Sequence, residues 1–119
     1  MKRRIKPEPP KFPPLPPNAS ETLILRACLD YLRLRGHFVF RVNGGGFETK
    51  LGGFVRCTDI SGVADIIGVT QDGKALAVEC KSKTGRQSVW QKAFETAWAE
   101  RGGVYVLARS VEDLQEAGL

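Results

Sequence analysis

The order of hydrophobic patterns along the chain predicts an α/β fold, in which helices flank a mixed β-sheet. Two stretches, residues 20–36 and 88–103, carry apolar side chains at helical spacing. Between and after them lie short runs rich in Val, Ile and Phe, two of which are joined by a tight-turn sequence. A length of 119 residues suits one hydrophobic core and is too short for two. We therefore expect one domain with one active or binding site.

The start of the chain differs in composition from the rest. All seven prolines lie within residues 7–17, and residues 1–19 hold five Lys or Arg side chains against one Glu. Proline fixes φ and lacks an N–H donor, so residues 1–17 are expected to form an extended basic arm, and residues 18–119 the folded domain. Of the net charge of +5, only +1 belongs to the remaining hundred residues. A nucleic-acid surface on the domain would therefore have to be a local patch.

The first half of the domain is expected to contain one helix and two strands. The helix runs from Ser20 to Gly36, a plausible C-cap. Residues 37–43 then predict a strand, residues 43–53 a mobile glycine-rich loop, and residues 54–58 a second short strand.

The second half is expected to build a hairpin and a crossover. Residues 66–70 and 75–81 flank Asp72-Gly73, a pair that favours the positive φ of a tight hairpin. Ser88 and Gln91 fit a capping box that opens the second helix, and residues 104–108 form the last strand. The right-handed crossover rule makes this strand parallel to residues 75–81. A closing helix over residues 110–117 follows, and the core has the order αβββαβα.

Several classes of protein are disfavoured. The three cysteines, Cys28, Cys57 and Cys80, are widely spaced and form no C-x-x-C pair, so a zinc or redox motif is not indicated and a reducing cytoplasm is expected. No apolar run is long enough to cross a bilayer. His37, the only histidine, has no nucleophile beside it and is expected to be structural.

An acidic cluster with a lysine is the strongest chemical signal in the sequence. Asp65 begins one hairpin strand, and Glu79 and Lys81 lie near the end of its partner, so antiparallel pairing brings them together. Glu79 and Lys81 are two residues apart and point to the same face. Carboxylate oxygens and a backbone carbonyl such as that of Cys80 suit Mg²⁺ or Mn²⁺. The alternative is a simple surface ion pair.

Two further polar residues have two interpretations each. Glu21 falls in the apolar half of the first helix, where a carboxylate needs a partner, but a first-turn acid also interacts favourably with the helix dipole. Gln91 could belong to the site or only to its capping box. Trp90, Phe94 and Trp98 share one helix face and are expected to pack in the core rather than stack on bases.

These residues resemble the PD-(D/E)xK nuclease superfamily and, within it, the VRR-NUC family of virus-type replication and repair nucleases. The resemblance covers nearly all of residues 20–118. The supporting stretches are Ser20-Glu21, Arg41-Val42-Asn43-Gly44, Gly62-Val63-Ala64-Asp65-Ile66-Ile67-Gly68-Val69, Asp72-Gly73-Lys74, Ala77-Val78-Glu79-Cys80-Lys81, and Gln91 through Gly102-Gly103. One departure is Ala64, where the family usually has proline.

The resemblance implies a restriction-endonuclease-like core and a Mg²⁺- or Mn²⁺-dependent DNA endonuclease. Asp65 and Glu79 would bind the metal, together with the Cys80 backbone carbonyl and with Glu21, either directly or through water. Lys81 would be catalytic, and Glu21 and Gln91 would complete the catalytic set. A stand-alone, phage-type member is expected to act as a homodimer in the cytoplasm of a bacterial host and to cut branched DNA such as four-way (Holliday) junctions. An isologous dimer supplies the two symmetric sites that junction resolution needs.

Other readings stay open. The chain could be a non-catalytic DNA-binding or assembly module with a nuclease fold, or a nuclease for flaps or nicked duplex. Four basic side chains in or near the glycine-rich segment and the predicted site could contact DNA phosphates, with solvated surface as the alternative for each. They are Lys50, Arg56, Lys83 and Arg86.

Overall fold

The computed structural model describes residues 12–42, 46–56 and 59–119. Its helices and strands follow the predicted order closely. The elements are α1 (Glu21–Leu34), β1 (Phe38–Arg41), β2 (Gly46–Glu48), β3 (Phe54–Arg56), β4 (Ile66–Val69), β5 (Ala75–Cys80), α2 (Val89–Glu100), β6 (Val104–Ala108) and α3 (Val111–Glu116). The main sheet with its helices has the order αβββαβα, so the prediction of an α/β fold is confirmed.

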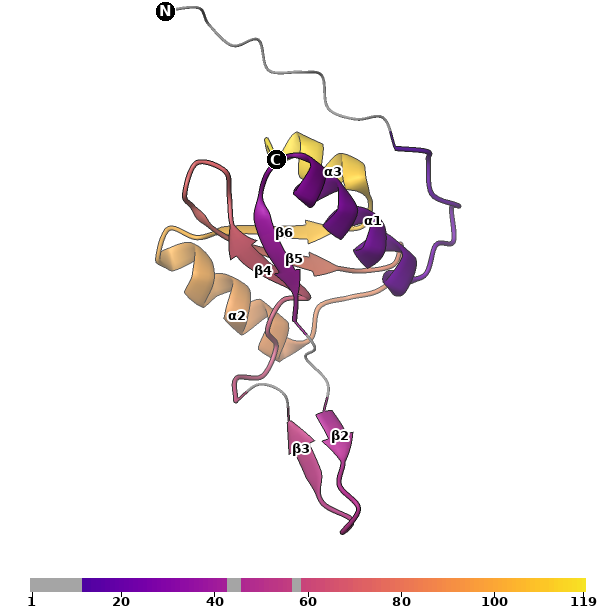
Figure 1. Cartoon of the computed structure of the whole chain (residues 1–119), viewed down its shortest axis with the longest axis vertical. Coiled ribbons are helices and arrows are strands. Elements are labelled where there is room, and N and C mark those ends of the chain that lie inside the picture. The colour runs from indigo at the N-terminus through magenta and orange to yellow at the C-terminus, as the bar shows by residue number, and fades with distance from the viewer. Residues whose placement is uncertain (1–11, 43–45, 57–58) are drawn as a thin grey trace, which may run out of the picture.

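The main sheet has four strands in the order β1-β4-β5-β6. β4 pairs antiparallel with β1 and with β5, while β6 pairs parallel with β5 after the crossover through α2. Helices α1 and α3 lie together on one face of this sheet, and α2 lies on the other (Figure 1). The predicted hairpin and the predicted parallel strand are both present. Among the described ranges, no helix is long and apolar enough to cross a membrane.

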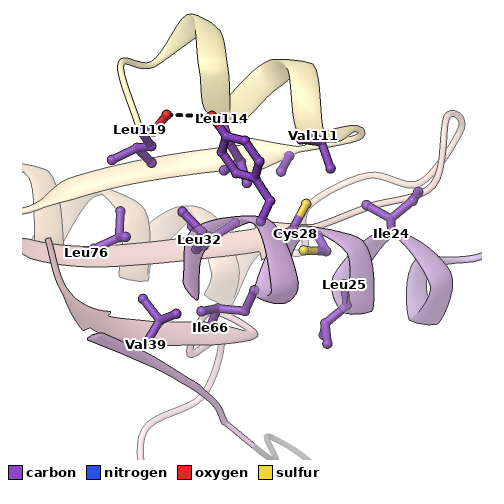
Figure 2. Close-up of a cluster of buried hydrophobic side chains, with 14 residues drawn as sticks. Ile24, Leu25, Cys28, Leu32, Val39, Ile66, Leu76, Val111, Leu114 and Leu119 are labelled. Carbon is purple, nitrogen blue, oxygen red and sulfur yellow. Dashed lines mark hydrogen bonds between the residues drawn. The ribbon is translucent and has the colours of Figure 1, made fainter. Parts of the chain in front are cut away.

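The hydrophobic core lies between the sheet and the α1–α3 pair (Figure 2). Alternate residues of β5, Leu76, Val78 and Cys80, point into it and are almost completely buried. The Tyr31 hydroxyl donates a hydrogen bond of 2.8 Å to the Leu119 backbone oxygen, which ties α1 to the end of the chain. Because side chains alternate along a strand, Ala77 and Glu79 point to the face that α2 covers.

The glycine-rich segment is more ordered than predicted. Residues 46–48 form strand β2, which pairs antiparallel with β3 in a separate two-stranded sheet. The loop expected over residues 43–53 is therefore wrong for residues 46–48. A turn closed by hydrogen bonds between Thr49 and Gly53 joins the two strands. Backbone pairing across this turn wins over the low strand propensity of glycine. Residues 43–45 and 57–58, with Cys57, lie outside the described residues.

The proline-rich arm contributes to the fold at its end. Phe12 and Leu15 pack against the core, and the Phe12 ring meets Tyr31 edge-on at 5.5 Å between centroids. Core packing therefore begins before Asn18, because these two apolar side chains lie against buried core residues. Residues 1–11 of the extended arm that was expected over residues 1–17 lie outside the described part of the chain.

The aromatic face of α2 differs from the prediction. Within the described structure no residue of α2 is buried, and Trp90 is 65% exposed. Phe94 and Trp98 are half-buried, with stacked rings 5.4 Å apart, and the Trp98 indole donates to the Val104 oxygen at 3.1 Å. Core packing was therefore the wrong expectation for Trp90. The reason is that α2 rests mainly on β6, at the edge of a narrow sheet.

Candidate metal and catalytic site

The register of β4 and β5 brings Asp65 and Glu79 together. Ile66 pairs with Val78, so one step further along the two strands Asp65 stands opposite Glu79. The Asp65 side chain is held there because its Oδ2 atom accepts a hydrogen bond of 2.8 Å from the Cys80 backbone N–H. The turn before Asp65 is fixed by Gly62, whose φ is +80° and whose backbone packs directly on Trp90 and Gln91 at the start of α2.

Glu79 is the centre of the cluster. It is 2% exposed, and its Oε1 atom lies 3.7 Å from the Lys81 ammonium, whose side chain is also largely buried. The same Oε1 atom accepts a hydrogen bond of 3.1 Å from Gln91. The other oxygen, Oε2, is buried and has no hydrogen-bond partner among the residues that the structure describes. A buried carboxylate oxygen without a partner is unfavourable unless a cation or a water molecule binds to it.

The electrostatics of the pair favour a bound cation. Burial, and then the adjacent carboxylate of Asp65, raise the pKa of Glu79 to about 8, against the opposing effect of Lys81. The more distant Glu21 carboxylate raises this pKa a little further. Two carboxylates placed this close tend to retain a proton at neutral pH, and a divalent cation would replace that proton.

Gln91 makes contacts of both kinds that the sequence left open, with its capping box and with Glu79. Its Oε1 atom accepts a hydrogen bond of 2.8 Å from the Ser88 backbone N–H, and its own backbone N–H donates a hydrogen bond of 3.1 Å to the Ser88 hydroxyl oxygen. These two bonds complete the predicted capping box. Because the amide oxygen is used by the cap, the amide NH₂ points to Glu79. The start of α2 is therefore coupled to the orientation of the Glu79 carboxylate.

Glu21 reaches the edge of the same cluster from α1. It is exposed, and it is the first residue of α1 after the Ser20 N-cap. A Cβ atom added to Gly85 would lie 3.0 Å from the Glu21 Oε1 atom and 3.4 Å from the Lys81 side chain. Gly85 thus leaves the space in which Glu21 and Lys81 approach each other.

Arg109 is a residue that the sequence analysis missed. Its guanidinium donates hydrogen bonds to the backbone oxygens of Ser82, Lys83 and Gly85, in the loop that follows Lys81. A signal was present, since Arg109 directly follows β6, and parallel strands bring their carboxyl ends to the same edge of a sheet. Arg109 therefore holds the loop that carries Lys81 into the site.

The donor set fits a hard divalent cation such as Mg²⁺ or Mn²⁺. No group of three or more His, Cys, Asp or Glu side chains in the described ranges is gathered closely enough to hold a metal by itself. Asp65 and the unpartnered Oε2 of Glu79 provide two carboxylates, and Mg²⁺ commonly uses one or two and retains several waters. Glu21 lies further out, where a water would have to bridge. The contact that Cys80 makes here is through its N–H, and its thiol points into the core.

The basic candidates for DNA contact are spread over two regions. Lys83 and Arg86 are exposed in the loop that follows Lys81. Lys50 is exposed in the turn between β2 and β3, and the Arg56 side chain lies outside what the structure describes. His37, expected to be structural, accepts a hydrogen bond from the Gln71 N–H at 3.0 Å and so connects β1 to the hairpin turn.

Comparison with known proteins returns no match to a family model, to a curated protein or to a solved structure. The resemblance to the VRR-NUC nucleases therefore rests on the residues of this chain alone and stays a prediction.

Proposed function

We propose that this protein is a Mg²⁺- or Mn²⁺-dependent endonuclease that hydrolyses phosphodiester bonds in DNA. The observation that carries the proposal is the buried Glu79 carboxylate, whose Oε2 atom has no described partner, beside Asp65 and Lys81. A surface ion pair, the competing interpretation, would be exposed, whereas the Glu79 and Lys81 side chains are 2% and 12% exposed. A buried cluster of this kind is typical of a functional site.

The chain supplies distinct contributions to such a reaction. Asp65 and Glu79 would hold the cation, which when bound contributes Lewis-acid stabilisation of the charge that develops on the phosphate. The Lys81 ammonium can donate to a phosphate oxygen or orient the attacking water. Gln91 fixes the Glu79 carboxylate, and Glu21 can receive a hydrogen bond from water at the edge of the site. Arg109 positions the loop that carries Lys81.

DNA as the substrate is supported by the family resemblance and by basic residues in the loop that follows Lys81. Lys83 and Arg86 lie two and five positions after Lys81 and are exposed, so they can contact DNA phosphates. Among DNA structures we propose branched DNA, with the four-way junction as the specific case. Symmetric cleavage of a junction requires two sites related by a two-fold axis. Flaps and nicked duplex are the alternative substrates.

The test is a cleavage assay on a matched set of labelled DNAs. The purified chain is incubated with a four-way junction, a flap, a nicked duplex and a plain duplex of shared sequence, with Mg²⁺, Mn²⁺ or EDTA. We expect metal-dependent cleavage that is fastest on the junction. Lys81→Ala and Glu79→Gln should remove it, because one lacks the ammonium and the other a metal ligand.

Lys74→Ala is the matched control. Lys74 is an exposed lysine in the β4–β5 turn, at the opposite end of the hairpin from Asp65 and Glu79, and its loss should leave cleavage unchanged. Absence of metal-dependent cleavage on every substrate would refute the proposal. Junction binding without cleavage, unaffected by Lys81→Ala, would instead support a non-catalytic DNA-binding module.

A further inference from the structure

A groove of about 770 Å³ runs along α2, and Ala75 of β5 and Gly103 also line it. We call it the α2 groove: its apolar wall is formed by the α2 side chains Trp90, Ala93, Phe94, Ala97 and Trp98, and the loop of residues 59–61 borders it. Ala93 and Ala97 are exposed as well as Trp90. These five residues have the i, i+3, i+4, i+7, i+8 spacing of a helix face that packs against another protein element.

The apolar surface continues from the groove across the sheet. Ala75 of β5 lines the groove and lies opposite Val69 of β4. Val69 in turn lies opposite Phe38 of β1. Val69 is 44% and Phe38 76% exposed. A contiguous apolar surface of this extent marks an interaction site, and a stable dimer needs about 800 Å² per partner. The row from Phe38 to Ala75 adds to the area that the helix alone provides.

The charges at the two ends of the groove indicate which partner fits. Asp59 belongs to the loop that packs, through Gly62, on the first turn of α2, whereas Arg101 is the C-cap of the same helix. The twelve residues of α2 span about 18 Å, so these two charges lie too far apart to pair within one chain. A second α2 packed antiparallel would place each Asp59 beside the partner's Arg101. In the same arrangement the two helix dipoles point in opposite directions, which is electrostatically favourable.

The small residues in the middle of the helix fit the same arrangement. Ala93 and Ala97 are one turn apart and exposed, with aromatic rings on both sides. Small side chains at the centre let two helix backbones approach closely, and the rings at the ends then cover the contact. A face that is complementary to itself in charge and in shape is the property that an isologous two-fold interface requires.

The sequence analysis already expects a homodimer but does not place its interface. We propose that this interface is the α2 groove, together with the exposed row from Phe38 to Ala75, and that the two α2 helices pack antiparallel in it. This inference goes beyond the proposed nuclease activity and does not depend on it, because its test measures mass. It has a structural consequence for the carboxylate cluster, since the interface helix also carries Gln91, which orients Glu79. Dimer formation would therefore fix the start of α2 in both copies.

The first test is the mass of the full chain in solution. Sedimentation velocity from about 1 to about 100 µM should show a species with the mass of two chains, which dissociates to single chains on dilution. Ala97→Glu places a charge in the centre of the interface and should give a monomer. Thr96→Glu is the matched control, because Thr96 is exposed on the other side of the same helix. Circular dichroism should show that both variants are folded.

The second test reverses the charges. Asp59→Arg and Arg101→Asp each replace two attractive contacts by two repulsive ones, so each variant alone should dimerise about tenfold more weakly or worse. An equimolar mixture of the two should form a heterodimer as tightly as the unmodified chain, because every contact across the two-fold axis is again between opposite charges.

Three outcomes would overturn the proposal. A wild-type chain that stays monomeric at about 100 µM would show that a second copy does not occupy the groove. A dimer that Ala97→Glu leaves intact would place the interface elsewhere. Charge variants that fail to associate when mixed would exclude the antiparallel arrangement.

Discussion

Replacement of Glu79 by Gln should change the pH dependence of stability in the metal-free protein. Burial and the neighbouring Asp65 raise the pKa of Glu79 to about 8, from about 4.5 in an unfolded chain. A folded-state pKa above the unfolded value means that the folded protein binds the proton more tightly. The stabilising effect of this proton is full below about pH 4.5 and is lost as the pH rises to about 8.

The magnitude follows from linkage. Each pH unit in the middle of this window changes the free energy of unfolding by about 1.4 kcal/mol for one proton. The slope flattens toward each of the two pKa values, so the loss between pH 5 and pH 8 is about 3.5 kcal/mol. In a domain of this size that corresponds to roughly 15 °C in melting temperature. Glu79→Gln carries no titrating group at this position and should lack this part of the decrease.

The assay is thermal unfolding in EDTA, followed by circular dichroism at intervals from pH 5 to pH 8. His37 titrates in the same region with the opposite sign: burial, and then Arg35, lower its pKa, so its contribution is lost as the pH falls. Because His37 is present in both proteins, the difference between their two slopes isolates Glu79. Equal slopes in wild type and Glu79→Gln would refute the reasoning.

Addition of metal extends the same experiment. Mg²⁺ or Mn²⁺ competes with the proton, so it should raise the wild-type melting temperature more at pH 8 than at pH 6. Glu79→Gln should show little of this effect. A metal-induced shift of equal size in both proteins would mean that the ion binds elsewhere.

Further substitutions test the geometry around the cluster. Gly62→Ala should destabilise the fold by several kcal/mol in thermal unfolding, because a Cβ atom would lie 2.3 Å from the Trp90 backbone. Gly73→Ala, also at positive φ but in open space, should cost only about 1–2 kcal/mol. Equal losses in the two variants would show that the close contact is unimportant. Gln91→Ala should lower the free energy of unfolding by about 1 kcal/mol, because the helix cap is lost, and should also weaken metal binding measured by calorimetry. An unchanged metal affinity would show that Gln91 acts only as a capping residue. Arg109→Ala should lower cleavage and increase amide exchange in residues 82–85, and unaltered exchange would exclude its positioning role.

Local sequence was sufficient for the elements other than β2 and for most of the candidate site. The Asp72-Gly73 turn determines the hairpin register, and this register alone places Asp65 opposite Glu79. The period of two along a strand places Lys81 on the same face as Glu79. The Ser88–Gln91 capping box defines the start of α2. Each of these predictions depends on residues that are close together in the chain or joined by one short turn.

Tertiary structure decided what depends on contacts between distant segments. Burial of Glu79, and hence its raised pKa, follows from packing that no local pattern contains. Arg109 binds carbonyl groups more than twenty positions earlier in the chain, because the crossover brings the ends of β5 and β6 to one edge of the sheet. The aromatic face of α2 has the spacing of a core helix, yet it is left open because the sheet beneath it is narrow. Periodicity identifies which residues share a face, and only the arrangement of neighbouring elements determines whether that face is covered.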